Sequence, residues 1–173
     1  MPGSQLVIGP ATGADLRGVA EIFAHYVTGS VVTFEDTPPT VADWRRRLDD
    51  LAGRGLPFLV ARADGEVAGY AYASPWRPKP AYRHTVEDTV YLAPGATGRG
   101  LGRRLLAELL ARAGQAGARQ MVAVIADAGV DSEASVALHR ALGFAHAGRL
   151  TAVGHKHGRW IDTVLMQRGL APD

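Results

Sequence analysis

The most informative stretch of the chain is Thr97-Gly98-Arg99-Gly100-Leu101-Gly102, which stands between a predicted strand and a predicted amphipathic helix. Glycines let the backbone approach a ligand closely, and the first turn of a helix offers N–H groups that have no acceptor inside the helix. Together these features favour binding of a pyrophosphate, to which Arg99, Arg103 and Arg104 can add charge-assisted hydrogen bonds. The alternative is a tight strand-to-helix turn in which the glycines serve packing only.

Two familiar glycine motifs disagree with this stretch. The G-x-G-x-x-G spacing of a dinucleotide-binding turn would require glycine at position 103, where an arginine stands, and that turn would follow the first strand of its domain. A P-loop would continue with Gly-Lys-Ser or Gly-Lys-Thr, which is not found after these glycines. Both of these nucleotide-binding motifs are therefore excluded.

Hydrophobic periodicity on both sides of the stretch predicts alternating strands and helices. The strand before it covers 82–92, the helix after it covers 99–115, and a long loop is predicted at 28–39. Further strands are predicted at 5–9, 58–63, 66–73, 119–126, 145–154 and 159–168, and further helices at 12–26, 41–52 and 132–142. This order predicts a mixed sheet with helices packed against it, which is an α+β fold.

Length and composition narrow the class of protein. The 173 residues predict a single domain, 1–173, and a hydrophobic content of 47% is sufficient for a sizeable core. The absence of cysteine excludes disulfides, thiolate zinc sites and a cysteine nucleophile. A net charge of +2 does not favour non-specific binding of nucleic acid. No segment approaches the roughly 20 apolar residues of a membrane helix. The first residues do not resemble a secretory signal, so we expect a cytoplasmic protein without nucleic-acid or membrane partners.

Four more blocks follow in order along the chain: Thr85–Leu92 (TVEDTVYL), 121–125 (MVAVI), 138–144 (LHRALGF) and 154–160 (GHKHGRW). Together with the Arg-Gly-Leu-Gly turn they resemble the GCN5-related N-acetyltransferases. Within that superfamily the resemblance is to the phosphinothricin N-acetyltransferases, a group that includes acetyltransferases of methionine sulfoximine and methionine sulfone. It covers nearly the whole chain and implies an acyl-CoA N-acyltransferase fold, with a mostly antiparallel central sheet, about four helices on both of its faces, and a homodimer.

The resemblance also implies acetyl-CoA as co-substrate, with direct transfer of the acetyl group to the α-amine of a small amino-acid-like substrate. The residues that it implies for cofactor binding are Val90, Tyr91, Leu92, Gly98, Arg99, Gly100, Leu101, Gly102, Arg103, Ser132 and Ser135. Backbone N–H groups around 90–92 would face the thioester oxygen. Two positions depart from the family pattern: Thr97 replaces a glutamine or arginine, and Ser132 replaces an asparagine that touches the cofactor arm.

Glu87 and His139 are the candidate catalytic residues. A protonated amine must lose a proton before it can attack, and a carboxylate can take that proton through water. Glu87 matches the glutamate of the family's TVE motif, although a surface glutamate is the alternative. Asp88 is expected on the opposite face of the strand, where it cannot line the same pocket without a bulge. His139 is a candidate acid for the departing thiolate or, equally, a histidine packed against the sheet.

An amino-acid substrate requires a partner for its carboxylate. Arg77 and Arg83 are the candidates, because a guanidinium binds a carboxylate or phosphinate through two hydrogen bonds. Phe34, Glu35 and Trp76 are expected to wall the acceptor pocket. A solvated arginine surface and a core position for Phe34 are the alternatives.

Three alternatives to this assignment are a metal site, a binding module and an acetyltransferase for another amine. His155, His157 and Glu87 carry donor atoms suited to a metal, but the histidines also match a family loop, so no metal is predicted. A non-catalytic acyl-CoA-binding module would have no need of a base such as Glu87. An acetyltransferase for a polyamine, an aminoglycoside or a protein N-terminus remains open, although Arg77 and Arg83 disfavour polycationic acceptors.

Overall fold

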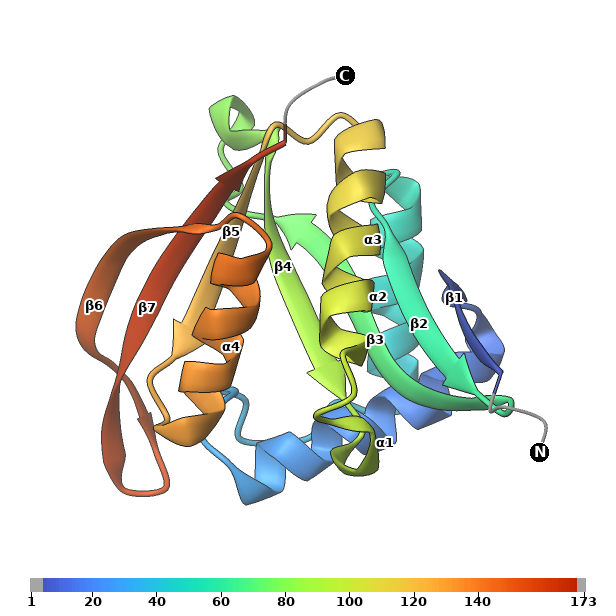
Figure 1. Cartoon of the computed structure of the whole chain (residues 1–173), viewed down its shortest axis with the longest axis horizontal. Helices are drawn as coiled ribbons and strands as arrows, with labels where there is room; N and C mark the ends of the chain where they lie inside the picture. Colours follow the sequence, from blue (N-terminus) through green and yellow to red (C-terminus); the bar gives the residue numbers. More distant parts are fainter. Residues whose placement is uncertain (1–4, 171–173) are drawn as a thin grey trace.

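The computed structural model describes residues 5–170, and the strands among them form one sheet of seven in the order β1-β2-β3-β4-β5-β7-β6 (Figure 1). The strands are β1 (Leu6–Pro10), β2 (Phe58–Ala63), β3 (Glu66–Pro75), β4 (Thr85–Leu92), β5 (Gln120–Ala126), β6 (Ala145–Lys156) and β7 (Arg159–Gly169). Within the described residues, β4 and β5 are the one parallel pair, and every other neighbouring pair is antiparallel. The predicted mixed, mostly antiparallel sheet is confirmed.

In the described part of the chain, four α-helices cover both faces of this sheet, as predicted: α1 (Leu16–Gly29), α2 (Val41–Gly53), α3 (Leu101–Gln115) and α4 (Val130–Ala141). Leu105 and Leu109 lie one helical turn apart on α3 and are fully buried in the same hydrophobic cluster as Met121 of β5. On the opposite face, Trp44 of α2 packs edge-to-face on Tyr70 of β3, with ring centroids 5.5 Å apart. The sheet therefore separates two cores, one under α3 and α4 and the other under α1 and α2.

The parallel strands β4 and β5 pair over only three residues. Their register runs from Thr85 opposite Gln120 to Glu87 opposite Val122 and stops there. Beyond Glu87, β4 stays paired with β3, and β5 stays paired with β7. Figure 1 shows β4 and β5 side by side at one end and well apart at the other. The edge of β4 that faces this opening has no strand beside it among residues 5–170, so its backbone groups form no strand-to-strand hydrogen bonds there.

Several predicted boundaries were wrong by a few residues. The strand predicted at 82–92 begins only at Thr85, because Pro80–Tyr82 forms a 3-10 turn; proline fixes a φ value suited to such a turn. The first helix continues past Tyr26 to Gly29, since Val27 still belongs to its buried stripe. The helix after the glycine turn begins at Leu101, and α4 begins two residues before Ser132. None of these shifts changes the order of the elements.

Candidate active site

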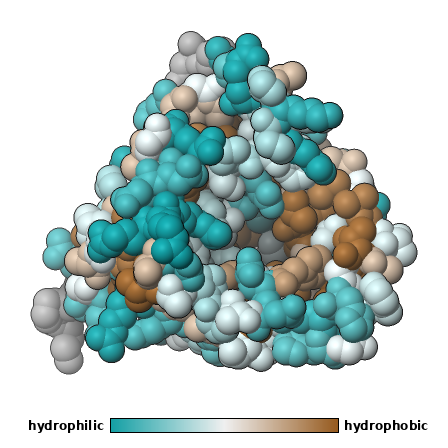
Figure 2. Space-filling model, turned by 180° about the vertical axis from the view of Figure 1, so that it is seen from behind, coloured by the Kyte–Doolittle hydropathy of each residue, from teal (hydrophilic) through white to brown (hydrophobic). Residues whose placement is uncertain are grey.

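A pocket of about 580 Å³ lies in the opening between β4 and β5. Its walls come from residues 87–92 of β4, 124–126 of β5, one side of α4, the glycine turn and the segment 32–34 that follows α1, with single residues from α1 (Tyr26) and β7 (Thr163). Figure 2 shows the hollowed surface on the side of α1 and α2, with hydrophobic residues gathered along one rim. A volume of several hundred Å³ with a few polar groups is typical of a small-molecule site.

The glycine turn at the start of α3 fits a phosphate group. Gly98 and Gly100 both have φ of +75°, a left-handed conformation that favours glycine, and a Cβ added to either would meet no atom within 4 Å. The turn is thus open on its outer side. The first N–H groups of α3 have no acceptor within the helix, and the positive end of the helix dipole lies there. The residues present therefore fit the pyrophosphate of an acyl-CoA.

Glu87 is half-buried and lines the pocket at the last paired position of β4 and β5. Burial raises the pKa of its carboxyl, and the nearby Asp88 carboxylate raises it further, while Arg77 opposes both effects. A carboxylate whose pKa is raised toward neutrality is a stronger proton acceptor at physiological pH. The environment of Glu87 is therefore suited to a general base.

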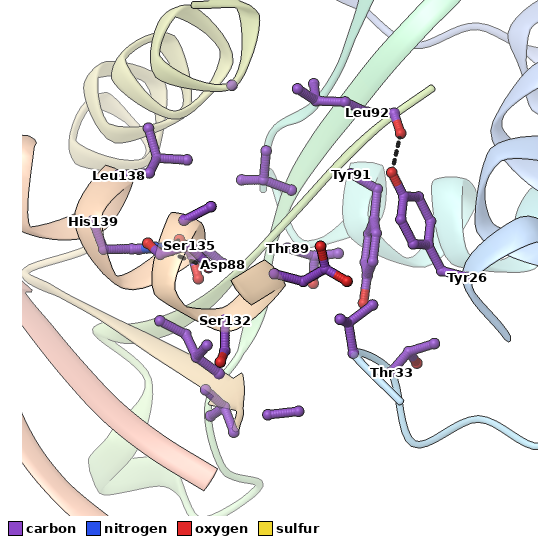
Figure 3. A pocket seen from close by; sticks show the side chains of 18 of the residues that line it. Tyr26, Thr33, Asp88, Thr89, Tyr91, Leu92, Ser132, Ser135, Leu138 and His139 are labelled. Carbon is purple, nitrogen blue, oxygen red and sulfur yellow. Dashed lines mark hydrogen bonds and ion pairs between the residues drawn. The ribbon is translucent and has the colours of Figure 1, made fainter. Parts of the chain in front are cut away.

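Asp88 and His139 form a buried pair at the same pocket (Figure 3). His139 Nδ1 lies 2.7 Å from the carbonyl oxygen of Ser135, which only accepts, so Nδ1 carries a proton. His139 Nε2 lies 2.7 Å from Asp88 Oδ2. Burial by itself lowers the pKa of His139, but the hydrogen bond and charge of Asp88 outweigh it and raise this pKa. Both ring nitrogens thus face oxygen acceptors, an arrangement that favours the protonated form of the imidazole.

Comparison with known families decides the identity of this fold. The sequence model of the Acetyltransferase (GNAT) family matches residues 19–144. The chain belongs to the GNAT acetyltransferases. The predicted family, the predicted acyl-CoA N-acyltransferase fold and the predicted class of enzyme, an acetyl-CoA-dependent N-acetyltransferase, are confirmed together.

The chain is similar to several named acetyltransferases of this family. A phosphinothricin N-acetyltransferase of Alcaligenes faecalis is 49% identical over 156 residues, which cover 90% of this chain and 78% of the relative. An L-methionine sulfoximine/L-methionine sulfone acetyltransferase of Pseudomonas aeruginosa is 41% identical over 92% of this chain and 91% of its own. A crystal structure of a phosphinothricin acetyltransferase from Sinorhizobium meliloti in complex with acetyl-CoA superposes with a TM-score of 0.90 at 47% identity. That likeness covers 96% of this chain and 89% of the other.

The predicted cofactor residues fall into two groups in this acetyltransferase. Those that line the pocket are Val90, Tyr91, Leu92, Gly98, Gly102, Ser132 and Ser135. Arg99, Gly100 and Arg103 are exposed in and beside the glycine turn. Leu101 is only 5% exposed and packs in the core, which leaves its backbone N–H as its one group for a ligand. The Ser132 hydroxyl donates to the Gly129 carbonyl at 2.7 Å and accepts from the Ala128 N–H at 3.1 Å. It therefore already forms hydrogen bonds with the backbone at the start of α4.

The predicted acceptor residues are only partly brought together. Phe34 lines the pocket and is 41% exposed, so it is no core anchor. Glu35, Trp76, Arg77 and Arg83 do not line the pocket itself. The guanidinium carbon of Arg77 lies 5.0 Å from the centroid of the Trp76 ring. The positive charge of Arg77 lowers the pKa of the Glu87 carboxyl. Arg83 is exposed and donates to the Pro80 carbonyl at 3.2 Å, within its own turn.

The expectation that Asp88 cannot share a pocket with Glu87 was wrong. The two side chains do point to opposite faces of β4, as the period of a strand requires, and no bulge lies between β4 and its neighbour β3. Both nevertheless line the pocket, because the pocket passes through the opening between β4 and β5 and reaches both faces of the sheet. Glu87 therefore approaches it from the side of α1, and His139 with Asp88 from the side of α4.

Sequence reasoning missed other residues of the site. Tyr26 is half-buried beside Val27, the last buried residue of α1, and its hydroxyl donates to the Leu92 carbonyl at 2.5 Å (Figure 3). Thr33 lies beside the Tyr91 hydroxyl. An aromatic residue at the polar end of an apolar stripe was a signal for Tyr26. Thr33 carried no signal in the sequence, because its place depends on how the loop folds over the sheet.

Residues 5–170 carry neither a metal-binding cluster nor a membrane-spanning helix. No group of three or more histidine, aspartate or glutamate side chains in that range is arranged to hold a metal ion, and His155 packs instead on Trp160, with ring centroids 4.6 Å apart. In the same range, no helix combines the length and apolar character needed to cross a membrane.

Proposed function

We propose that this acetyltransferase moves the acetyl group of acetyl-CoA to the α-amine of a small amino acid of the phosphinothricin, methionine sulfoximine or methionine sulfone class. The observation that carries the proposal is the position of Glu87, half-buried in a pocket that also meets the glycine turn of α3. The names of the relatives at 41–49% identity support the substrate class.

Glu87, His139 and the backbone of β4 have separate roles in the proposed transfer. Glu87 takes a proton from the substrate ammonium, directly or through water, and leaves a neutral amine. The amine nitrogen bonds to the thioester carbon while the carbon–sulfur bond breaks, and free backbone N–H groups of β4 stabilise the charge that grows on the carbonyl oxygen. His139 gives a proton to the departing thiolate, and the second proton that the nitrogen loses as it becomes an amide passes to water, from which His139 is protonated again. With no cysteine in the chain to carry the acetyl group, the transfer is direct.

Binding follows from the same geometry. The open turn at Gly98 and Gly100 holds the pyrophosphate of acetyl-CoA, helped by Arg99 and Arg103. Arg77, whose charge acts on the pKa of Glu87, binds the carboxylate of the amino acid. Phe34 supplies an apolar wall on the acceptor side. Arg83, turned toward Pro80, is the weaker candidate for a carboxylate partner.

Thiol release from acetyl-CoA tests the function. The amines are phosphinothricin, methionine sulfoximine, methionine sulfone, a polyamine and an aminoglycoside, and the control is the Glu87→Gln variant. We expect turnover with the first three amines, and loss of turnover with retained acetyl-CoA binding in the variant. Turnover confined to the polyamine or the aminoglycoside would contradict the substrate class. Binding of acetyl-CoA without turnover of any amine would favour a non-catalytic acyl-CoA-binding module or an acceptor outside the panel.

We also infer a cytoplasmic homodimer in which each subunit is a single acetyltransferase domain, 1–173. The apolar side chains of Leu150, Val153 and Trp160 on β6 and β7 support the dimer, since they are 45%, 54% and 71% exposed. Light scattering of the purified protein tests it. A molar mass of one subunit at micromolar concentration would contradict the dimer.

A further inference from the structure

Lys156 is a buried lysine that takes no part in the proposed mechanism. It is the last residue of β6 and is only 4% exposed. His157 and Gly158 follow it with φ of 50° and 70°, the left-handed pair that closes a two-residue hairpin between β6 and β7. This tight turn holds Lys156 opposite Arg159, so the place of its side chain is set by the hairpin.

The Lys156 ammonium reaches the segment that walls the pocket. Its Nζ donates to the backbone carbonyl of Thr33 at 2.9 Å, across 123 positions of sequence. Thr33 and Phe34 both line the pocket, and Thr33 also lies beside Tyr91 of β4. This segment is therefore held between the central sheet on one side and the β6–β7 hairpin on the other.

A second contact joins the same two parts of the chain. The Phe34 ring lies directly on Gly154 of β6, where an added Cβ would come within 2.4 Å of the ring. No residue other than glycine leaves room for the ring in this position. Gly154 and Lys156 thus hold consecutive residues of the loop, Phe34 by its ring and Thr33 by its carbonyl.

Burial of an ammonium is costly, and an apolar side chain would fill the same space at lower cost. Burial lowers the pKa of Lys156, while the carboxylates of Asp36 and Glu35 on the same loop oppose this effect. Among residues 5–170, the partners of this charge lie on the loop: one carbonyl at close range and two carboxylates farther away. A lysine at this position is therefore explained by its hydrogen bond to the loop, because packing alone would favour an apolar side chain.

We propose that Lys156 is a positioning residue that fixes residues 32–34 as the acceptor wall and, with Gly154, sets how large an acceptor the pocket admits. The wall lies on the face of β4 that carries Glu87 and Tyr91. Holding Phe34 against Gly154 keeps room for a small unbranched amino acid beside Glu87 and keeps bulkier amines out. This inference rests on the proposed function.

Steady-state kinetics of Lys156→Met test the proposal, with Arg17→Met as a control at an exposed position far from the pocket. For Lys156→Met we expect KM for the amino-acid acceptor to rise about tenfold, as for the loss of one hydrogen bond of an ion. KM for acetyl-CoA should stay within about twofold, since the glycine turn is untouched. Lys156→Arg should recover part of the loss. An equal rise of both KM values, or no change in either, would overturn the proposal.

Gly154→Ala tests the same wall without touching the lysine, and its φ is not in the left-handed region. Its Cβ would displace the Phe34 ring, so we expect the same selective rise in acceptor KM and altered selectivity between phosphinothricin and larger amines.

Amide hydrogen exchange supplies a readout that needs no acceptor. Exchange at residues 31–36 should quicken in Lys156→Met and not in Arg17→Met; unchanged exchange would overturn the proposal even if the enzyme acts on another amine. Failure of the proposed function is recognised separately, by a wild-type enzyme that is silent on the amino-acid panel.

Discussion

His139 Nε2 and Asp88 Oδ2 are 2.7 Å apart in a pair that joins α4 to β4, with both side chains at most 9% exposed. Because Ser135 already occupies the other ring nitrogen, an ionised Asp88 holds His139 doubly protonated. The pair thus brings a proton to the pocket from the face of β4 opposite to Glu87. It also makes the pKa of His139 sensitive to one carboxylate.

The first prediction concerns stability and pH. The pKa of His139 is raised above its ordinary value of 6.5, so its contribution to stability is complete below that value and is lost as pH rises through the folded-state pKa. The wild-type free energy of unfolding should therefore fall more steeply above pH 6.5 than that of His139→Gln. Urea unfolding at intervals from pH 6 to pH 9 measures this difference. Parallel curves for the two proteins would show that His139 is not held charged.

The second prediction separates an acid from a structural histidine. Asp88→Asn removes the charge that raises the pKa of His139, so the alkaline limb of kcat should move to lower pH if His139 protonates the thiolate. Loss of stability with an unmoved limb would assign His139 to packing alone. Titration of the His139 ring by NMR in both proteins confirms that its pKa has changed.

The third prediction concerns Glu87. Replacing it by glutamine removes the proton acceptor and keeps the size of the side chain, so kcat should fall by roughly 10²–10⁴-fold. Because the wild-type pKa is raised, the acidic limb of kcat/KM should lie above 4.5, the ordinary value for a glutamate. Acetyl-CoA affinity, measured by calorimetry, should be unchanged. A variant that turns over at the wild-type rate across the pH range would eliminate Glu87 as the base.

The fourth prediction addresses the glycine turn. Gly100→Ala places a Cβ at φ of +75°, which costs about 1–2 kcal/mol of stability, and directs it into the open side of the turn. We expect acetyl-CoA to bind at least tenfold more weakly. Gly55→Ala, at φ of +70° with no atom within 4 Å, is the matched control: it carries the same backbone strain away from the glycine turn and should leave binding unchanged. Reduced stability with normal affinity would mean that the glycines serve the turn and not the ligand.

The fifth prediction concerns the ion pair of Asp15 and Arg62, which joins the start of α1 to β2. Burial raises the pKa of Asp15, but hydrogen bonds from Arg62 and Thr12 outweigh it, and the pKa is lowered overall. Arg62→Met leaves the carboxylate with only Thr12, so we expect a loss of roughly 1–3 kcal/mol at pH 7. The exposed pair of Arg17 and Glu21 is the control, where Arg17→Met should cost less than about 0.5 kcal/mol.

The same pair predicts a pH window. A lowered pKa contributes stability above the ordinary value of 3.8 and loses it as pH falls through the folded-state pKa. The difference in unfolding free energy between wild type and Arg62→Met should therefore shrink below pH 3.8. A difference that persists at lower pH would mean that Arg62 acts through packing.

The sequence alone determined the features that depend on neighbouring residues. The stripe of Leu105 and Leu109 specified α3, because a helix of period 3.6 places them on one face. The glycines at 98 and 100 specified an open turn, since glycine adopts a positive φ without strain. Glu87 was assigned differently, through the resemblance of its TVE motif to a known family, and the other two assignments needed no such resemblance. Local periodicity and local backbone chemistry are sufficient for these assignments.

Tertiary structure alone decided which distant residues meet. The end of β4–β5 pairing at Glu87 brings Asp88 and Glu87 to one pocket from opposite faces, which alternation along a single strand cannot reveal. Lys156 reaches Thr33 only because the β6–β7 hairpin lies over the loop that follows α1. Such contacts depend on strand register and on the path of loops, which the packing of the whole sheet sets and no local pattern encodes.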